Sequence, residues 1–277
     1  MRSSRPHPHI VFTGGGTGGH LFPGLAVAER LRSDLPQLRI TFAGGGRPFE
    51  QGHVAAAGYE YLTLPCRPLP RRLRDVYPFL ADNFHGYWEA AKFLAHEHVA
   101  IVVGLGGYGS VPMSRAAIRR GVPLILLEQN AVPGRATRWL ASGATLVCTA
   151  FEQANRYLGS RCPVRVTGNP LRSQFAHEIA ALERSAGGNG RPARLAALAH
   201  HRGDTRRSKV LLVLGGSGGA RSLNQHVPRA LSKVGPGLRG WRIAHQTGAA
   251  DLRPTRQLYR KLGLKAIVVA FVAEMPR

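Results

Sequence analysis

One local pattern, a short apolar run that ends in glycines, occurs three times along the chain. It occupies residues 9–20 (HIVFTGGGTGGH), 100–110 (AIVVGLGGYGS) and 209–220 (KVLLVLGGSGGA). Apolar runs rich in β-branched residues are typical of buried strands, and clustered glycines allow turns that other residues rarely adopt. Open parallel sheets bind ligands at the carboxyl ends of their strands. The pattern therefore predicts an α/β chain with ligand-binding turns after three of its strands.

Further apolar runs alternate with helical patterns. Helical spacing begins at Leu21, with Pro23 expected in the first turn; another helix ends at Gly121, and a third covers about 223–231. This alternation predicts parallel βαβ units with helices on both faces of a sheet. Strands are expected at 9–13, 38–44, 99–107, 122–130, 144–150 and 164–170, and again at 209–214, 241–248 and 265–272.

The composition changes after the sixth predicted strand. Residues 185–208 are rich in Gly, Arg, Ala and His, as linkers and insertions are, and an α/β pattern then restarts. We therefore expect an N-terminal Rossmann-like domain over 1–172, a linker or insertion over 173–208, and part of a second Rossmann-like domain over 209–277.

The chain is strongly basic, with 38 Lys and Arg against 15 Asp and Glu and a net charge of +23. Such a surface favours anionic partners such as phosphorylated substrates or acidic lipid headgroups, although an Arg-rich composition also results from a genome rich in G and C. A nucleic-acid binder is disfavoured because no recognition motif is present. The three scattered cysteines and the absence of a signal peptide or long apolar run predict a cytoplasmic protein.

The glycine loops do not fit the common nucleotide motifs. Gly14, Gly16 and Gly19 satisfy G-x-G-x-x-G, but the second predicted strand ends in Ala43 and glycines rather than in an acidic residue for a ribose. No loop has the lysine of a phosphate-binding P-loop. Each loop is either a bare strand-to-helix turn or an anion site built from helix N-terminal amides, and the presence of three loops favours the anion site.

Five segments resemble the MurG family of bacterial glycosyltransferases in order and spacing: 14–28 (GGGTGGHLFPGLAVA), 104–112 (GLGGYGSVP), 127–141 (LEQNAVPGRATRWLA), 168–172 (GNPLR) and 215–224 (GGSGGARSLN). The resemblance implies a GT-B fold of two Rossmann-like domains, the first for a lipid acceptor and the second for a nucleotide sugar. It also implies inverting transfer of N-acetylglucosamine from UDP-GlcNAc to undecaprenyl-pyrophosphoryl-MurNAc-pentapeptide (lipid I), giving lipid II for peptidoglycan.

The same resemblance implies roles for single residues. His20 is a candidate general base, since a neutral imidazole suits that task near pH 7; the alternative is a histidine that caps the helix start. Glu128 is a second catalytic candidate that orients a partner or binds sugar hydroxyls, unless it is a solvated glutamate at a strand edge. The residues implied for UDP-GlcNAc are Thr17, Gly18, Gly19, Asn130, Arg172, Ser217 and Val272.

Two further features bear on the implied substrates. The family commonly has Gln where this chain has Gly218, which leaves the backbone of that loop as the expected contact. Tyr108 is a candidate acceptor contact or a packed loop aromatic. No cofactor is expected, and the absence of a D-x-D pair agrees with a reaction that needs no metal.

A basic and aromatic segment covers residues 67–93. Four arginines precede an apolar helical face, an arrangement suited to anionic lipid; the alternative is an ordinary helix with this face in the core. The arginines are Arg67, Arg71, Arg72 and Arg74, and the apolar residues include Val76, Phe79, Leu80, Phe84 and Trp88. We expect peripheral attachment to the cytoplasmic face of the inner membrane, with other cell-wall synthesis proteins as further partners.

The resemblance also implies that the C-terminal domain is truncated, since family members continue with further donor-binding motifs beyond the segment that ends this chain. The alternative to an active transferase is a catalytically incomplete fragment that keeps only the lipid-acceptor and membrane-surface module.

Overall fold

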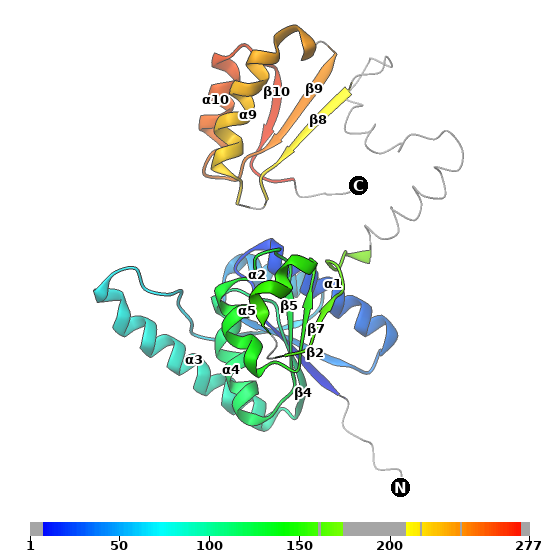
Figure 1. Cartoon of the computed structure of the whole chain (residues 1–277), viewed down its shortest axis with the longest axis vertical. Coiled ribbons are helices and arrows are strands. Elements are labelled where there is room, and N and C mark those ends of the chain that lie inside the picture. Colours follow the sequence, from blue (N-terminus) through cyan, green and yellow to red (C-terminus); the bar gives the residue numbers. More distant parts are fainter. Residues whose placement is uncertain (1–7, 160–161, 174–208, 217, 239, 273–277) are drawn as a thin grey trace. The chain divides into compact units, whose positions relative to one another are not determined.

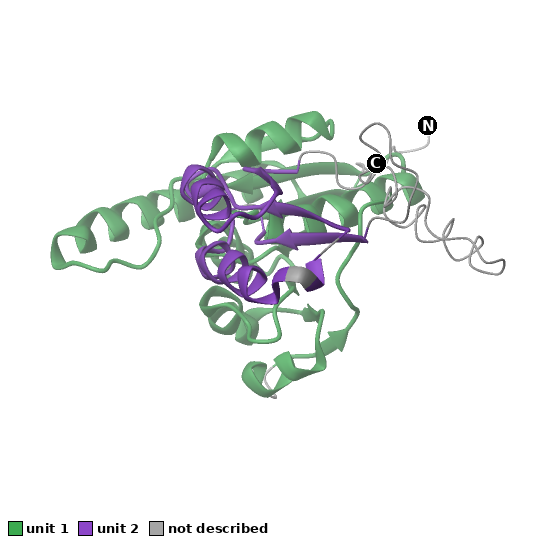
Figure 2. Cartoon of the chain, turned by 90° about the horizontal axis from the view of Figure 1, so that it is seen from above, with its two compact units in different colours: residues 1–173 green, residues 174–277 purple. Residues whose placement is uncertain are grey.

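The computed structural model describes residues 8–159, 162–173, 209–216, 218–238 and 240–272 (Figure 1). The chain divides into two compact units, residues 1–173 and 174–277 (Figure 2). Most of the predicted linker, residues 174–208, lies outside the described residues, as does Ser217.

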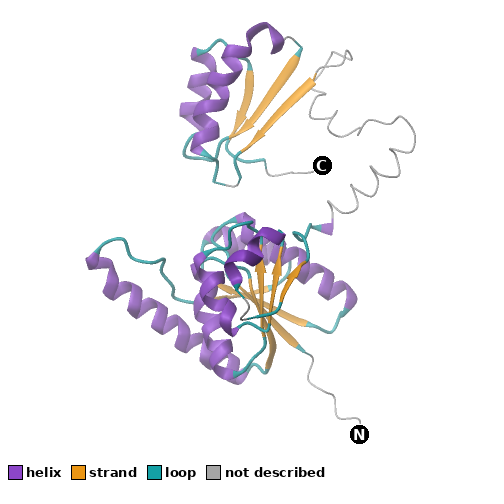
Figure 3. Ribbon diagram, viewed as in Figure 1, coloured by secondary structure: helices purple, strands orange, loops and turns teal. Residues whose placement is uncertain are grey.

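Unit 1 is built on a parallel sheet of seven strands in the order β3-β2-β1-β4-β5-β6-β7 (Figure 3). From β1 to β3 the chain adds strands toward one edge of the sheet, and from β4 onward it adds them toward the other edge. The strand order therefore reverses between the neighbouring strands β1 and β4. The strands are β1 (His9–Thr13), β2 (Arg39–Gly44), β3 (Glu60–Thr63), β4 (Val99–Gly104), β5 (Leu124–Glu128), β6 (Leu146–Thr149) and β7 (Val164–Val166).

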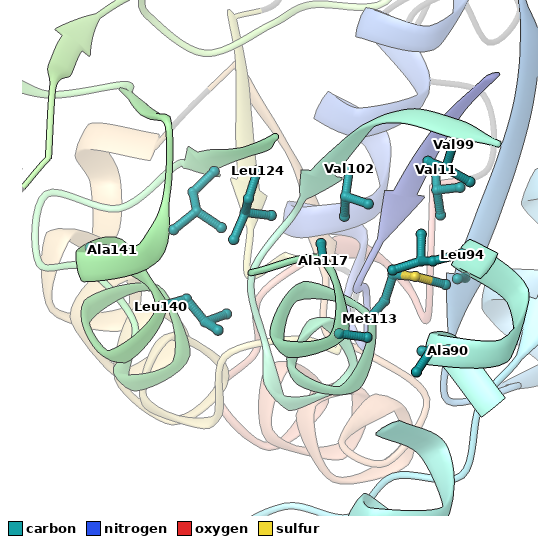
Figure 4. Packing of buried hydrophobic residues seen from close by; sticks show 14 of the residues in the cluster. Val11, Ala90, Leu94, Val99, Val102, Met113, Ala117, Leu124, Leu140 and Ala141 are labelled. Carbon is teal, nitrogen blue, oxygen red and sulfur yellow. The ribbon is translucent and has the colours of Figure 1, made fainter. Parts of the chain in front are cut away.

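Helices cover both faces of this sheet, as the alternating pattern predicts. One core cluster joins the sheet to α1 (Gly18–Asp34) and α2 (Pro48–Ala56). The cluster on the opposite face, shown in Figure 4, joins it to α3 (Val76–His96), α4 (Val111–Arg120) and α5 (Arg135–Leu140). Shorter elements are α6 (Asn155–Leu158) and the 3₁₀ turns Leu73–Asp75, Tyr108–Ser110, Ala141–Gly143 and Glu152–Ala154.

The six predicted strands of unit 1 are confirmed, but several bounds and local features differ. The strand expected at 164–170 ends at Val166, and the strand expected at 122–130 covers Leu124–Glu128. The sequence patterns did not predict β3 or α2. β3 has only four residues, and buried and exposed residues do not alternate along it. The strand expected at 99–107 ends at Gly104, where the glycine turn begins. α1 begins at Gly18, so Pro23 lies in the second turn rather than the first, where it removes the amide that would bond to the carbonyl of Gly19.

Unit 2 has a parallel sheet of three described strands in the order β10-β9-β8. Its two helices pack on one face of the sheet (Figure 3), as right-handed crossovers that advance in one direction require. The elements are β8 (Lys209–Leu214), α9 (Arg221–Val234), a 3₁₀ turn (Gly235–Leu238), β9 (Trp241–Gln246), α10 (Leu252–Lys261) and β10 (Ala266–Val269). The predicted α/β class with two parallel sheets is therefore confirmed.

Candidate functional site

The glycine loops of unit 1 meet at the point where the strand order reverses. The first loop joins β1 to α1, and the second joins β4 to α4 through the turn at Tyr108–Ser110. These helices cover opposite faces of the sheet, and such a switch point is where open α/β sheets bind ligands.

The first loop adopts a backbone that only glycine tolerates well. Gly14, Gly15 and Gly16 have φ values of 118°, 146° and 86°. A Cβ atom on Gly14 would lie 2.5 Å from the carbonyl oxygen of Gly106, so the two loops pack backbone against backbone. The glycine density therefore reflects both conformation and close approach.

His20 lies in the first turn of α1 and faces the second loop. Its Nδ1 atom lies 3.2 Å from Oγ1 of Thr17, the N-cap residue. A Cβ on Gly106 would lie 3.5 Å from Nε2 of His20, so this edge of the ring lies over the second glycine loop. Within the described residues, Nε2 has no hydrogen-bond partner. Thr17 thus engages one ring nitrogen and leaves the other for a ligand.

Glu128 ends β5, the strand next to β4, and is buried with 4% of its surface exposed. One carboxylate oxygen accepts hydrogen bonds from the backbone amide (3.0 Å) and the side-chain amide (2.8 Å) of Asn130. The other accepts from the backbone amide of Gly134 at 3.0 Å, at the start of α5. The alternative of a solvated glutamate is therefore wrong, and the exposed Asn130 side chain is held in place by Glu128.

Two residues that the sequence reading missed hold the first loop from α2. The carboxylate of Glu50 accepts a hydrogen bond from the amide of Gly16 at 2.6 Å and another from the hydroxyl of Tyr61. The guanidinium of Arg47 donates to the carbonyl of Gly16 at 2.9 Å and to the hydroxyl of Tyr108 at 2.6 Å. In the sequence, these two residues are marked only by their spacing, with Glu50 three residues after Arg47 at the start of a helix.

The other predicted residues of unit 1 lie around the same strand ends. Gly18 is buried, whereas Thr17 and Gly19 are exposed. Tyr108 is half-buried and is held by Arg47. The guanidinium of Arg172 lies over the ring of Phe22 in α1, 4.9 Å from its centroid. The C-terminal end of unit 1 therefore lies against the helix that follows the first glycine loop.

Unit 2 carries the third glycine loop after β8. The side-chain amide of Gln246 donates to the carbonyl of Gly216 at 2.7 Å, and a Cβ on Gly219 would overlap the backbone of Thr247. A Cβ on Gly218 would meet no atom within 4 Å, so the position where the family commonly has Gln is open. Val272 is half-buried.

A buried polar network supports this third loop. His245 contacts the hydroxyl of Tyr259 through Nδ1 at 3.0 Å and Oδ1 of Asn224 through Nε2 at 3.1 Å. Asn224 in turn donates to the carbonyl of Thr247 and to Asp251. Burial lowers the pKa of the His245 imidazole, so the ring is neutral near pH 7.

Most of the apolar residues predicted to meet lipid are exposed on α3, between its first turn and residue 88. Leu80, Phe84 and Trp88 have 58%, 64% and 50% of their surface exposed, and Phe79 is half-buried. The alternative that this face packs in the core is wrong, because α3 instead buries Gly86, Ala90, Ala91 and Leu94. The amino-terminal end of α3 extends away from the rest of unit 1 (Figures 1 and 2). We refer to Leu80, Phe84 and Trp88 as the α3 apolar face.

The described part of the chain contains no helix that combines the length and the apolar character needed to cross a bilayer. Nor does it contain a group of three or more His, Cys, Asp or Glu side chains placed to hold a metal ion.

Comparisons with known proteins cover both units. Residues 10–149 match the glycosyltransferase family 28 N-terminal domain, and residues 210–277 match the family 28 C-terminal domain. A protein of Pelobacter propionicus named UDP-N-acetylglucosamine--N-acetylmuramyl-(pentapeptide) pyrophosphoryl-undecaprenol N-acetylglucosamine transferase is 34% identical over 96% of this chain and 70% of its own. The protein of the same name from Geobacter sulfurreducens is 33% identical over 96% of this chain and 68% of its own.

Solved structures agree with this assignment. The crystal structure of MurG from Acinetobacter baumannii matches 97% of this chain and 68% of its own, with 26% identity and a TM-score of 0.61. A UDP-GlcNAc 2-epimerase from Neisseria meningitidis has a TM-score of 0.62 over 98% of this chain and 73% of its own at 12% identity, which shows the shared fold alone. With both family 28 domains and these relatives in agreement, the chain belongs to the MurG family of glycosyltransferases.

Proposed function

We propose that the chain transfers N-acetylglucosamine from UDP-GlcNAc to lipid I, the undecaprenyl-pyrophosphoryl-linked MurNAc-pentapeptide, as the names of its relatives state for them. The observation that carries this proposal is the placement of His20 where the two glycine loops of unit 1 meet, with Nδ1 engaged by Thr17. A general base must lie within hydrogen-bond reach of the hydroxyl that it deprotonates, and Nε2 lies over the second glycine loop with no hydrogen-bond partner among the described residues.

The proposed reaction is a single displacement. Nε2 of His20 accepts the proton of the acceptor hydroxyl while that oxygen forms a bond to the anomeric carbon, and the bond from that carbon to the UDP oxygen breaks. The configuration inverts, and UDP leaves with the bonding electron pair. Helix N-terminal amides at the glycine loops are suited to stabilise the diphosphate charge without a resident cofactor.

Donor binding is assigned to the remaining predicted residues. Asn130, held by Glu128, presents its amide at the strand ends of unit 1. Arg172 supplies a guanidinium, which suits phosphate, and Ser217 and Val272 are the further donor contacts that the family resemblance implies. Thr17, Gly18 and Gly19 line the same first loop.

Membrane attachment is part of the proposal. The exposed arginines Arg71, Arg72 and Arg74 precede the α3 apolar face in the chain, and Arg67 pairs with Asp82 of α3. Aromatic side chains combined with cationic ones favour an anionic bilayer surface. An acceptor with an undecaprenyl tail lies in a membrane, so an enzyme that reaches it gains from binding at the cytoplasmic surface.

The test is a transfer assay with the purified chain, radiolabelled UDP-GlcNAc and a lipid I analogue. We expect labelled lipid II, and we expect the variant H20A to lose about 10²–10⁴-fold in rate while UDP-GlcNAc binding persists. Full activity of H20A would refute the assignment of the base. Binding of the lipid I analogue without transfer or UDP binding would instead favour an acceptor-binding module.

A further inference from the structure

Both polar groups of the Gly16 backbone are held by side chains from the start of α2. Oε1 of Glu50 accepts the Gly16 amide at 2.6 Å, and the Arg47 guanidinium donates to the Gly16 carbonyl at 2.9 Å. Arg47 is the N-cap of α2, and Glu50 is its third residue, so one helical turn supplies both contacts. We call Arg47 and Glu50 the Gly16 clamp.

The carboxylate of the clamp is itself fixed. Glu50 has 2% of its surface exposed, and its second oxygen accepts a hydrogen bond from Tyr61. The Tyr61 hydroxyl oxygen also accepts from the amide of Gly46 at 3.2 Å. Burial, followed by the hydrogen bond to Glu50, raises the pKa of Tyr61, so its hydroxyl remains a donor at all ordinary pH values.

Burial of a carboxylate is costly unless its oxygens are hydrogen-bonded. In the described part of the chain, Glu50 forms no ion pair with Lys, Arg or His. Its polar contacts are a loop amide and the Tyr61 hydroxyl. Glu50 therefore stabilises the backbone of the first glycine loop and does not neutralise a cationic side chain.

The clamp also connects the two glycine loops. The second arm of the Arg47 guanidinium donates to Tyr108 of the second loop at 2.6 Å. A Cβ on Gly15 would lie 3.0 Å from the Glu50 carboxyl carbon, so the loop rests directly on the buried acid. Displacement of Glu50 would remove the acceptor of the Gly16 amide, and displacement of Arg47 would remove the donor to the Gly16 carbonyl, in a run of three consecutive glycines of positive φ.

We propose that Glu50 and Arg47 are positioning residues that fix the first glycine loop, and through it His20, in the geometry that sugar transfer requires. This inference rests on the proposed function. Misplacement of a catalytic group by about 1 Å can cost 10²-fold in rate, so a loop of flexible glycines gains from such support.

The first test does not depend on activity. Amide hydrogen exchange is measured by NMR in the wild-type chain, in E50A, in E50Q and in E152Q, a control at an exposed glutamate. In E50A, the Gly16 amide should exchange at least 10-fold faster, while the amides of Val11 and Phe12 in β1 keep their protection. E50Q should restore most of the Gly16 protection, since its carbonyl oxygen can accept the same bond, and E152Q should match the wild type.

The second test is kinetic. E50A and R47A should lower kcat for GlcNAc transfer by about 10–100-fold with the KM for UDP-GlcNAc within about 3-fold, and E50Q should recover part of the loss. An unchanged Gly16 exchange rate in E50A, or an equal loss of protection in β1, would overturn the clamp. If the wild-type chain transfers no sugar, the proposed function fails, while the exchange data still decide whether the clamp exists.

Discussion

The Nδ1 atom of His20 and the hydroxyl oxygen of Thr17 lie 3.2 Å apart across the first turn of α1. If Nδ1–H donates to Thr17, Nε2 keeps its lone pair for the acceptor hydroxyl, as a base requires. T17V removes the hydroxyl that selects this tautomer and should lower kcat by about 10-fold or more, whereas T17S should remain close to the wild type. Equal rates for T17V and T17S in the transfer assay would contradict this role.

Glu128 should act on both stability and donor binding. In E128A, two amides of Asn130 and the amide of Gly134 lose their acceptor, so we expect a loss of about 1–3 kcal/mol in the free energy of unfolding. The KM for UDP-GlcNAc should rise because Asn130 is no longer held. Urea unfolding and steady-state kinetics measure these effects, with E152A at an exposed site as the control, expected within about 0.5 kcal/mol of the wild type.

The α3 apolar face should bind anionic membranes without supporting the fold. The double variant F84S/W88S should keep the wild-type unfolding midpoint, since both side chains are exposed, but should float less with vesicles that contain phosphatidylglycerol. F151S, which removes an exposed aromatic side chain elsewhere in unit 1, should float like the wild type. Unfolding of the double variant, or undiminished flotation, would count against this surface.

Two helical glycines should respond to alanine in opposite directions. A Cβ on Gly86 in α3 would lie 2.0 Å from the carbonyl oxygen of Pro65, so G86A should cost about 1–3 kcal/mol in unfolding free energy. A Cβ on Gly52 in α2 would meet no atom within 4 Å, so G52A should stabilise by about 0.5–1 kcal/mol. Urea titration of both variants checks the pair. Stabilisation by G86A would disprove the close approach at Gly86, and destabilisation by G52A would disprove the open space at Gly52.

Stability should fall in mild acid because of buried histidine. Burial lowers the pKa of His245 from its ordinary value of 6.5, so the unfolded chain takes up a proton first as the pH falls. Stability from this group is therefore full above pH 6.5 and is lost as the pH drops through the lowered value. His9, whose pKa burial also lowers, acts in the same direction in unit 1.

The measurement is the unfolding free energy from urea titrations between pH 7.5 and 5. The variant H245Q should show a smaller loss over this range than the wild type. H85Q, at an exposed histidine, should keep the wild-type slope. An H245Q slope equal to that of the wild type would show that His245 does not contribute.

Much of the fold follows from local patterns. The apolar run His9–Thr13 predicts a strand because parallel strands in the centre of such a sheet are buried on both faces. Gly121, with its left-handed backbone, ends α4 where the sequence predicts. β3 escaped prediction because its four residues form an edge strand whose identity depends on pairing with β2.

The sequence by itself determined the α/β alternation, the three glycine turns and the family motifs, because each of these depends on residues close together in the chain. Only the tertiary structure decided that Glu50 supports Gly16 from 34 residues away, that Glu128 is buried beneath Asn130, and that Phe84 is exposed. These outcomes depend on which strands lie side by side and on which helical face the sheet covers. No local pattern encodes such contacts, since the same amphipathic helix can turn its apolar side to a core or to a membrane.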